Sequence, residues 1–202
     1  AYIYIRGEYY KSIERLEKAI RDARMKNYLG QNIFGTAVSI DIEIKLGAGS
    51  YLCGEELTLL ESLEGKRGYP RIKPPFPAEK GLFGFPTLVN NVETLATIPT
   101  IIEHGAEWYT GLGTEDSPGT KIFTVSGDVE KPGYFELELG VSLREVIFDF
   151  AGGIKKGRKC QAVLIGGAAG TFVNKTVLDT PISYDNLKEK GAVLGLSLIH
   201  IS

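Results

Sequence analysis

The chain has 202 residues, and its 43% hydrophobic and 24% charged content is that of an ordinary soluble globular protein. A net charge of −2 argues against nucleic acid or an anionic membrane surface as a partner. No apolar run approaches the roughly 18–20 residues of a membrane span, so we expect no direct membrane insertion. Two cysteines, Cys53 and Cys160, are too few for a disulfide framework or a cysteine metal site, and a cytoplasmic setting is the default.

The first third of the chain predicts a strand, a helix and a strand. Tyrosine and isoleucine alternate over residues 1–6 as in a buried strand, a charged amphipathic helix is expected over 8–26, and a second strand over 37–46. Because the chain starts inside a strand without a methionine, we expect a fragment. Strand–helix–strand is the unit of a right-handed parallel sheet, and ligands bind beyond the carboxyl ends of such strands. Gly47 onward is that position, although Leu52 replaces the third glycine of the general dinucleotide fingerprint.

A turn from Tyr51 to Gly54 leads into a predicted helix over 55–64. Glu55 and Glu56 lie in its first turn, where acids offset the helix macrodipole. Acids there also exclude a phosphate from the positive helix end. The turn would then suit hydroxyl or amide donors, such as a ribose or a nicotinamide carboxamide. The residues alone leave both interpretations open.

Residues 66–86 contain five of the nine prolines, a density that forbids helix and favours a stiff, extended segment. Phe76 and two further phenylalanines offer ring faces for stacking. The pattern Arg71-x-x-Pro74-x-x-Pro77 also matches ligands of proline-recognition domains, but those ligands normally lie in polar, disordered tails. Basic side chains in the segment could hold a pyrophosphate: Lys66, Arg67, Arg71, Lys73 and Lys80.

Asn90 with Glu93 three residues later is a capping-box pattern that opens an apolar helix, interrupted by Pro99 and ending near His104. An asparagine-capped helix start with a threonine hydroxyl, from Thr94, is also an anion site, and a flavin phosphate is one candidate. By spacing alone, the capping interpretation is favoured.

The second half of the chain predicts a β-grasp pattern. Two strands joined by a turn are followed by a helix that the Ser142–Glu145 capping box opens, and then by another strand. We expect these elements over 121–125, 133–139, 142–150 and 162–165, after a polar connector over 106–118. The glycine run at 166–170 favours a tight turn over a phosphate loop, because no helix start follows it.

The tract Glu64–Ala78, EGKRGYPRIKPPFPA, together with Pro86–Thr94, PTLVNNVET, resembles the signature of the NADH- and FMN-binding (51 kDa-type) subunit of complex I. NAD-linked hydrogenases and formate dehydrogenases share this subunit type. The resemblance implies an α/β fold: part of a Rossmann-like parallel-sheet FMN/NADH domain over 1–112, then a soluble-ligand-binding, ubiquitin-like β-grasp domain over 113–195. Residues 196–202 depart from the family, and we expect them to be an atypical, non-native tail.

The resemblance also implies site residues and a reaction. The reaction is hydride transfer from NADH to FMN, followed by single-electron export to iron–sulfur clusters, with the cofactor supplying the reactivity. The implied site residues are Tyr51, Gly54, Glu55 and Glu56 around the flavin and nicotinamide, Lys73 and Phe76 on the dinucleotide, and Val89, Asn90, Asn91 and Thr94 on FMN.

The implied partners are NADH, an iron–sulfur subunit of the 24 kDa type and a cluster-bearing subunit, with attachment to the inner face of the membrane through the complex. A glycine-rich flavin cradle and the cysteines of a 4Fe–4S centre are expected outside this chain, so we expect the chain alone to hold FMN poorly. The alternative is a non-catalytic nucleotide-binding or scaffold fragment that docks on redox-complex subunits. A hydrolase using Glu55 and Glu56 ranks last, because adjacent helical residues point about 100° apart.

Overall fold

The computed structural model describes residues 1–167, 170–195 and 198–201. The chain divides into two compact units, Ala1–Asn91 and Val92–Ser202, which are described one at a time. This division lies well before residue 112, where the sequence predicted a domain boundary, because helices α4 (Val92–His104) and α5 (Ala106–Thr110) belong to the second unit.

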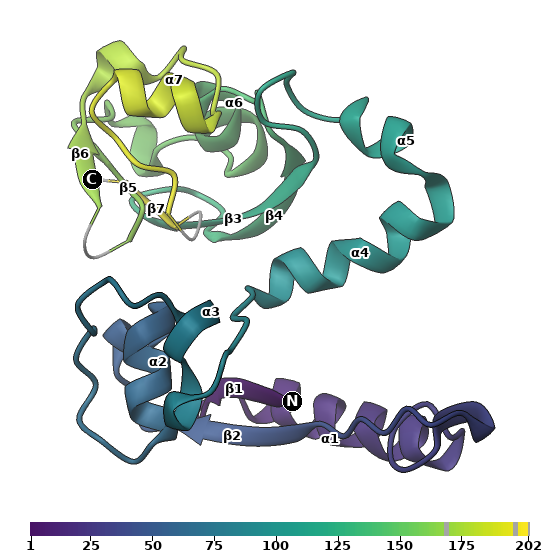
Figure 1. The fold of residues 1–202 in the computed structure, drawn as a ribbon. Helices are drawn as coiled ribbons and strands as arrows, with labels where there is room; N and C mark the ends of the chain where they lie inside the picture. The colour runs from purple at the N-terminus through teal and green to yellow at the C-terminus, as the bar shows by residue number, and fades with distance from the viewer. Residues whose placement is uncertain (168–169, 196–197, 202) are drawn as a thin grey trace. The chain divides into compact units, whose positions relative to one another are not determined.

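The first unit contains the expected parallel strand–helix–strand arrangement (Figure 1). Strands β1 (Tyr2–Arg6) and β2 (Glu43–Gly47) pair in parallel, and helix α1 (Tyr10–Met25) connects them. Strand β1 is half-buried, so the prediction of a buried strand is wrong. Strand β2 starts at Glu43 and not near residue 37, because Ile40 forms an isolated bridge with Gly30 instead.

A 3₁₀ turn at Tyr51–Gly54 follows β2 and leads into helix α2 (Glu56–Leu63), as the sequence predicted. Leu57 and Leu60 are almost completely buried and anchor α2 to the unit. Helix α3 (Pro77–Lys80) lies inside the proline-rich segment, where the sequence predicted no helix. The prediction fails because proline is tolerated at the first helical position, where its missing N–H has no partner to lose.

The second unit contains a mixed five-stranded sheet in the order β4-β3-β7-β5-β6. Its capping box is present: the Ser142 hydroxyl accepts from the Glu145 N–H, and the Glu145 carboxylate accepts from the Ser142 N–H. Helix α6 (Leu143–Glu145) continues into a π-helical turn over Val146–Phe150, and Figure 1 shows α6 and α7 (Tyr184–Glu189) on one side of the sheet. The strands are β3 (Thr120–Gly127), β4 (Gly133–Glu138), β5 (Val163–Ile165), β6 (Thr171–Val173) and β7 (Leu198–Ile201). The β-grasp prediction is therefore confirmed.

The middle strand of this sheet lies in the segment that we expected to be an atypical tail. Strand β7 pairs in parallel with β3 and antiparallel with β5. Ile199 and Ile201 alternate along it and are buried in the core. A domain ending at residue 195 would therefore omit the central strand. Residues 168 and 169 of the predicted tight turn lie outside the described residues.

The connector between the signature tract and the sheet is partly helical. Helix α4 ends at His104, as predicted, but it runs through Pro99, where the sequence predicted an interruption. Residues 106–118 were expected to be a polar connector, but α5 forms at their start. The rings of His104 and Trp108 lie 4.8 Å apart between centroids, four residues apart in sequence, and this contact joins the two helices.

Candidate functional site

Glu55 caps the helix that opens the candidate site. Its Oε2 atom accepts from the Leu57 N–H at 3.0 Å, the Thr58 N–H at 2.8 Å and the Thr58 hydroxyl at 3.0 Å. Glu55 is therefore the N-cap of α2 and not a first-turn residue, and one carboxylate oxygen satisfies backbone donors that a helix start leaves unpaired. Of the two adjacent acids, Glu56 is the one that faces a partner outside the helix.

That partner is Lys73. Its ammonium forms an ion pair with the Glu56 carboxylate, 17 residues away in sequence, and lies 6.0 Å from the centre of the Phe76 ring. The hydrogen bond that Lys73 donates to Glu56 raises the pKa of Lys73 above its ordinary value. Three predicted site residues thus come together: an acid, a base and an aromatic ring face.

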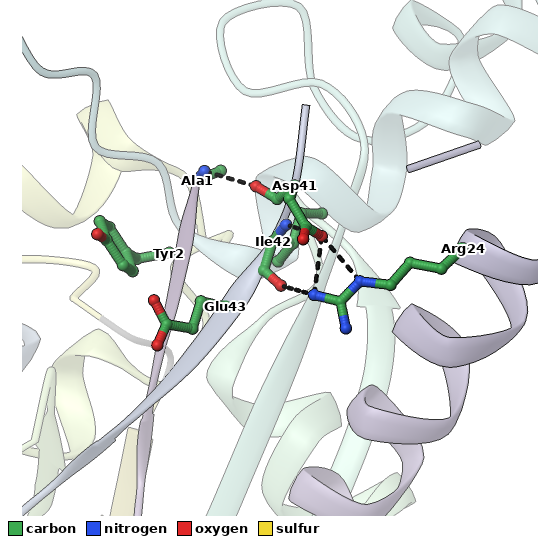
Figure 2. A pocket seen from close by; sticks show the side chains of 6 residues that line it. All are labelled: Ala1, Tyr2, Arg24, Asp41, Ile42 and Glu43. Carbon is green, nitrogen blue, oxygen red and sulfur yellow. Dashed lines mark hydrogen bonds and ion pairs between the residues drawn. The ribbon is translucent and has the colours of Figure 1, made fainter. Parts of the chain in front are cut away.

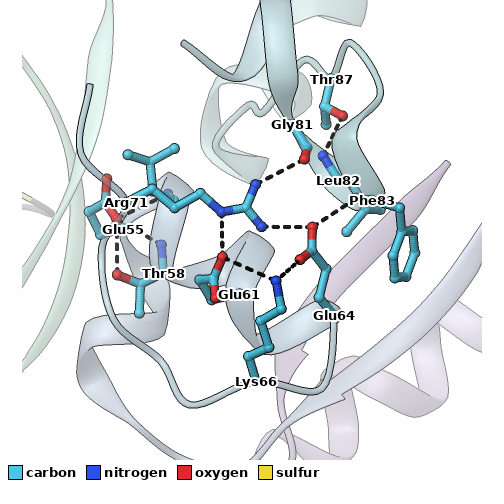
Figure 3. A network of polar contacts seen from close by, with 11 residues as sticks. Glu55, Thr58, Glu61, Glu64, Lys66, Arg71, Gly81, Leu82, Phe83 and Thr87 are labelled. Atoms are coloured by element: carbon cyan, nitrogen blue, oxygen red, sulfur yellow. Dashed lines mark hydrogen bonds and ion pairs between the residues drawn. The ribbon is translucent and has the colours of Figure 1, made fainter. Parts of the chain in front are cut away.

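Two other basic residues of the proline-rich segment (residues 66–86), Arg71 and Lys66, form ion pairs with Glu61 and Glu64. The Arg71 guanidinium contacts Glu61 at 2.5 Å and Glu64 at 2.7 Å, and Lys66 pairs with Glu64 at 2.7 Å (Figure 3). The hydrogen bonds from Lys66 and then Arg71 lower the pKa of Glu64 to about 2. Arg71 and Lys66 are thus paired with carboxylates on α2 and at its end, and the expectation that they hold a pyrophosphate stays a prediction. The sequence signal for this network is the spacing of Glu61 and Glu64, three residues apart on one helix face.

Several aromatic side chains of the first unit are exposed, among them Phe76 beside Lys73. Tyr51 is 48% exposed and Phe76 53%, and Phe83 and Phe85 are more exposed still. Apart from Gly54 and its chain neighbours, no atom of the described residues lies within 4 Å of the point where a Cβ of Gly54 would stand, so the backbone there is open to a ligand. Exposed ring faces beside a paired base and acid fit the planar rings and polar groups of a nicotinamide nucleotide.

The predicted flavin contacts begin where the first unit ends. Val89 is half-buried, Asn90 and Asn91 are exposed, and Thr94 is exposed in the first turn of α4, within the second unit. Helix α4 begins at Val92, so Asn91, not Asn90, directly precedes it.

The Asn90–Glu93 capping box stays a prediction, and the structure gives Glu93 partners that this pattern did not include. The Glu93 carboxylate reaches strand β3, where it accepts from the Ile122 N–H at 2.9 Å and pairs with the Lys121 ammonium at 2.8 Å. This pair ties the start of α4 to the sheet of the second unit.

A separate cavity of about 450 Å³ lies beside β1 and β2 (Figure 2). Its polar groups are largely paired with one another: the amino terminus donates to the Asp41 carbonyl at 2.7 Å, and Arg24 donates to the Asp41 carboxylate at 2.9 Å. Its described lining residues are Ala1, Tyr2, Arg24, Asp41, Ile42 and Glu43, none of which was predicted as a site residue.

Among the described residues, no group of three or more histidine, cysteine, aspartate or glutamate side chains could hold a metal ion. Within the same residues, every helix is too short or too polar to cross a membrane.

Residues 1–100 match the family model of the Nuo51 FMN-binding domain, and residues 122–170 match that of the SLBB domain. The chain belongs to the Nuo51 family. Both signature tracts lie in the first match, and the β-grasp sheet overlaps the second. The family expectation from the sequence is therefore confirmed.

Curated relatives in the Nuo51 family belong to two kinds of oxidoreductase. One is a subunit of the NADH-quinone oxidoreductase of Rhizobium meliloti, which is 48% identical over 96% of this chain and 46% of its own length. Another is the HndC subunit of the NADP-reducing hydrogenase of Solidesulfovibrio fructosivorans, which is 50% identical over 96% of this chain and 39% of its own length. The chain thus spans less than half the length of these relatives.

A solved structure of an NAD+-reducing NiFe-hydrogenase in the air-oxidized state has the same fold. It matches with a TM-score of 0.81 and 38% identity, over 100% of this chain and 32% of the hydrogenase chain. The H2-reduced state of that enzyme matches with a TM-score of 0.82.

Proposed function

We propose that this chain is part of the NADH-oxidising module of a multisubunit oxidoreductase, in which hydride passes from NADH to FMN and electrons leave through iron–sulfur clusters. One observation supports this most directly: the Lys73–Glu56 pair lies beside the exposed Phe76 ring inside the Nuo51 signature tract. The names of the relatives, which are subunits of an NADH-quinone oxidoreductase and of an NADP-reducing hydrogenase, point to the same activity.

In this proposal the chain's own residues bind and orient the dinucleotide. Phe76 offers a face for a planar ring, Lys73 supplies a positive charge for a phosphate or ribose, and Glu56 accepts from a ribose hydroxyl or a carboxamide N–H. Because Lys73 and Glu56 are paired with each other, each is held in place before the ligand arrives. We assign Tyr51, Gly54 and the capping Glu55 to the same site, on the turn that precedes α2.

FMN, when bound, accepts two electrons as hydride and releases them one at a time. We assign its contacts in this chain to Val89, Asn90, Asn91 and Thr94. Asparagine amides and a threonine hydroxyl donate and accept hydrogen bonds, as a flavin ring edge and a phosphate require. Thr94 also lies at a helix start, where unpaired N–H groups favour an anion.

The cluster and the partners lie outside these 202 residues in our proposal. A 4Fe–4S centre needs about four thiolates, and the chain has two cysteines, both free. We propose that the chain works with an iron–sulfur subunit of the 24 kDa type and a cluster-bearing subunit. Attachment to the inner face of the membrane would then be peripheral, through that complex.

The alternative of a non-catalytic nucleotide-binding or scaffold fragment keeps one observation in its favour. The chain spans less than half of its curated relatives, so its flavin site need not be complete. Titrating the purified chain with FMN and following flavin fluorescence separates the two cases. We expect weak, non-stoichiometric quenching; tight stoichiometric quenching would mean that these residues hold FMN unaided.

NADH oxidation itself is tested in the complete oxidoreductase that contains this chain. Reduction of an artificial acceptor should depend on NADH and on bound FMN. Activity that persists after the flavin has been removed would contradict the proposed function.

A further inference from the structure

Arg71 occupies an unusual place at the base of the segment that carries Lys73 and Phe76. We call residues 71–81, which include α3, the proline loop. Arg71 begins this loop and Gly81 ends it, and the Arg71 Nη1 atom donates to the Gly81 carbonyl at 2.9 Å. One side chain therefore bridges the two ends of the loop (Figure 3).

The same guanidinium fixes the loop to helix α2. Its Nε atom donates to Glu61 at 2.5 Å, and its Nη2 atom contacts Glu64 at 2.7 Å. The side chain of Arg71 is only 22% exposed and that of Glu64 only 8%, so water screens these pairs weakly. Three contacts in fixed directions use the planar, forked geometry that arginine has and lysine lacks.

Further hydrogen bonds close the base of the loop from the other side. The Glu64 Oε1 atom accepts from the Phe83 N–H at 2.8 Å, and the Thr87 hydroxyl accepts from the Leu82 N–H at 2.9 Å. The Thr87 N–H donates to the Pro77 carbonyl at 2.9 Å. The Glu64 carboxylate therefore holds the chain at two points, the Arg71 side chain and the Phe83 N–H.

Fixing the base of the loop also fixes its tip. Lys73 lies two residues beyond Arg71, and Pro74, Pro75 and Pro77 restrict the backbone up to and beyond Phe76. A change in direction at Arg71 would therefore displace Lys73 and Phe76 together, because few torsions in between can absorb it.

We propose that Arg71 is a positioning residue, a clamp that closes the proline loop on α2 and so sets Lys73 against Glu56 and Phe76 for the dinucleotide. This inference rests on the proposed function. It assigns Arg71 no contact with the ligand, in contrast to the pyrophosphate role that the basic composition of the loop indicated. Arg71 acts through Glu61, Glu64 and the Gly81 carbonyl.

The test uses the complete oxidoreductase with the substitution Arg71→Lys. A second variant, Glu64→Gln, weakens the same contact by changing the carboxylate that pairs with Arg71. Amide hydrogen exchange at Phe83 should accelerate about tenfold or more in both variants. In Arg71→Lys the Glu64 carboxylate that accepts from this N–H is no longer held by the guanidinium, and in Glu64→Gln an uncharged amide replaces that carboxylate. The KM for NADH should rise about tenfold, while kcat and flavin content change less than about twofold.

Arg24→Lys is the matched control. Arg24 also donates to a carboxylate, on Asp41, and to a backbone carbonyl, on Ile42 (Figure 2), but it lies in the last turn of α1, outside the proline loop. This control should leave the exchange of Phe83 and the KM for NADH unchanged.

A double variant separates positioning from direct binding. If Arg71 acts through Lys73, Arg71→Lys should add little to the KM of Lys73→Ala, whereas two direct ligands would give multiplied effects. Multiplied effects, or an unchanged KM and Phe83 exchange in both Arg71→Lys and Glu64→Gln, would overturn the clamp. If Lys73→Ala itself left the KM unchanged, the proposed dinucleotide site would fail instead, and the two failures are distinct.

Discussion

The Lys73 ammonium and the Glu56 carboxylate form an ion pair that joins the proline loop to the first turn of α2. Each side chain remains more than one third exposed, so the pair is open to water and to a ligand. The centre of the Phe76 ring lies 6.0 Å from the same ammonium. This relationship is the basis of the proposed dinucleotide site, and its energetic consequences can be measured.

Glu56→Gln should affect ligand binding more than folding. Because the pair is well exposed, its loss should change the free energy of unfolding by less than about 1 kcal/mol. The KM for NADH of the complete oxidoreductase should nevertheless rise, since Lys73 loses the partner that holds it. Chemical denaturation and steady-state kinetics check the two halves of this prediction. A loss of stability well above about 1 kcal/mol with an unchanged KM would show the pair to be structural.

Glu64 should make stability fall in acid. The hydrogen bonds from Lys66 and Arg71 lower its pKa in the folded protein from 4.5 to about 2. A carboxyl whose folded pKa is depressed stabilises the fold above its unfolded pKa and loses that contribution as pH falls, here between about 4.5 and about 2. Urea unfolding of the chain and of Glu64→Gln, compared from about pH 6 to about pH 2.5, measures this. The variant should lose less stability over that window; equal losses would contradict the assignment.

The Glu93–Lys121 pair should stabilise the second unit. Lys121 is 13% exposed and Glu93 29%, and Glu93 also accepts from the Ile122 N–H. Lys121→Met takes the ammonium away from a half-buried carboxylate, which should cost about 1–3 kcal/mol. Lys18→Met, which breaks the far more exposed pair with Asp22, should cost less than about 0.5 kcal/mol. Similar losses in both variants, measured by denaturant unfolding, would count against this role.

Sequence patterns predicted the elements that depend on periodicity. The alternation of β3 and β4 and the Ser142–Glu145 box are local signals, and both appear where they were expected. Helices α3 and α5 were missed because a helix of four or five residues has too little periodicity to detect. Strand β7 was missed because its departure from the family signature outweighed its own alternation of buried residues.

The candidate site was predictable only in part for an electrostatic reason. Counted within residues 66–86, the bases outnumber a single acid, and all of them looked free to bind phosphate. The acids that neutralise Arg71 and Lys66 lie just before this segment, on α2 and at its end. Only the fold brings Glu61 and Glu64 against the segment. The amino-acid composition of residues 66–86 alone could therefore not distinguish a basic residue that pairs within the protein from one that binds a ligand.

The most direct test of the account is the KM for NADH of Lys73→Ala in the complete oxidoreductase. Lys45→Ala is its matched control, because Lys45 also pairs with a glutamate, Glu43, and lies 5.6 Å from the centre of a ring, that of Tyr2.

We predict that Lys73→Ala raises the KM for NADH about tenfold or more while flavin content stays near that of the unmodified protein. Lys45→Ala should change neither quantity. Equal losses of NADH affinity and flavin in Lys73→Ala, or a KM no different from that of Lys45→Ala, would contradict the placement of the dinucleotide on the proline loop.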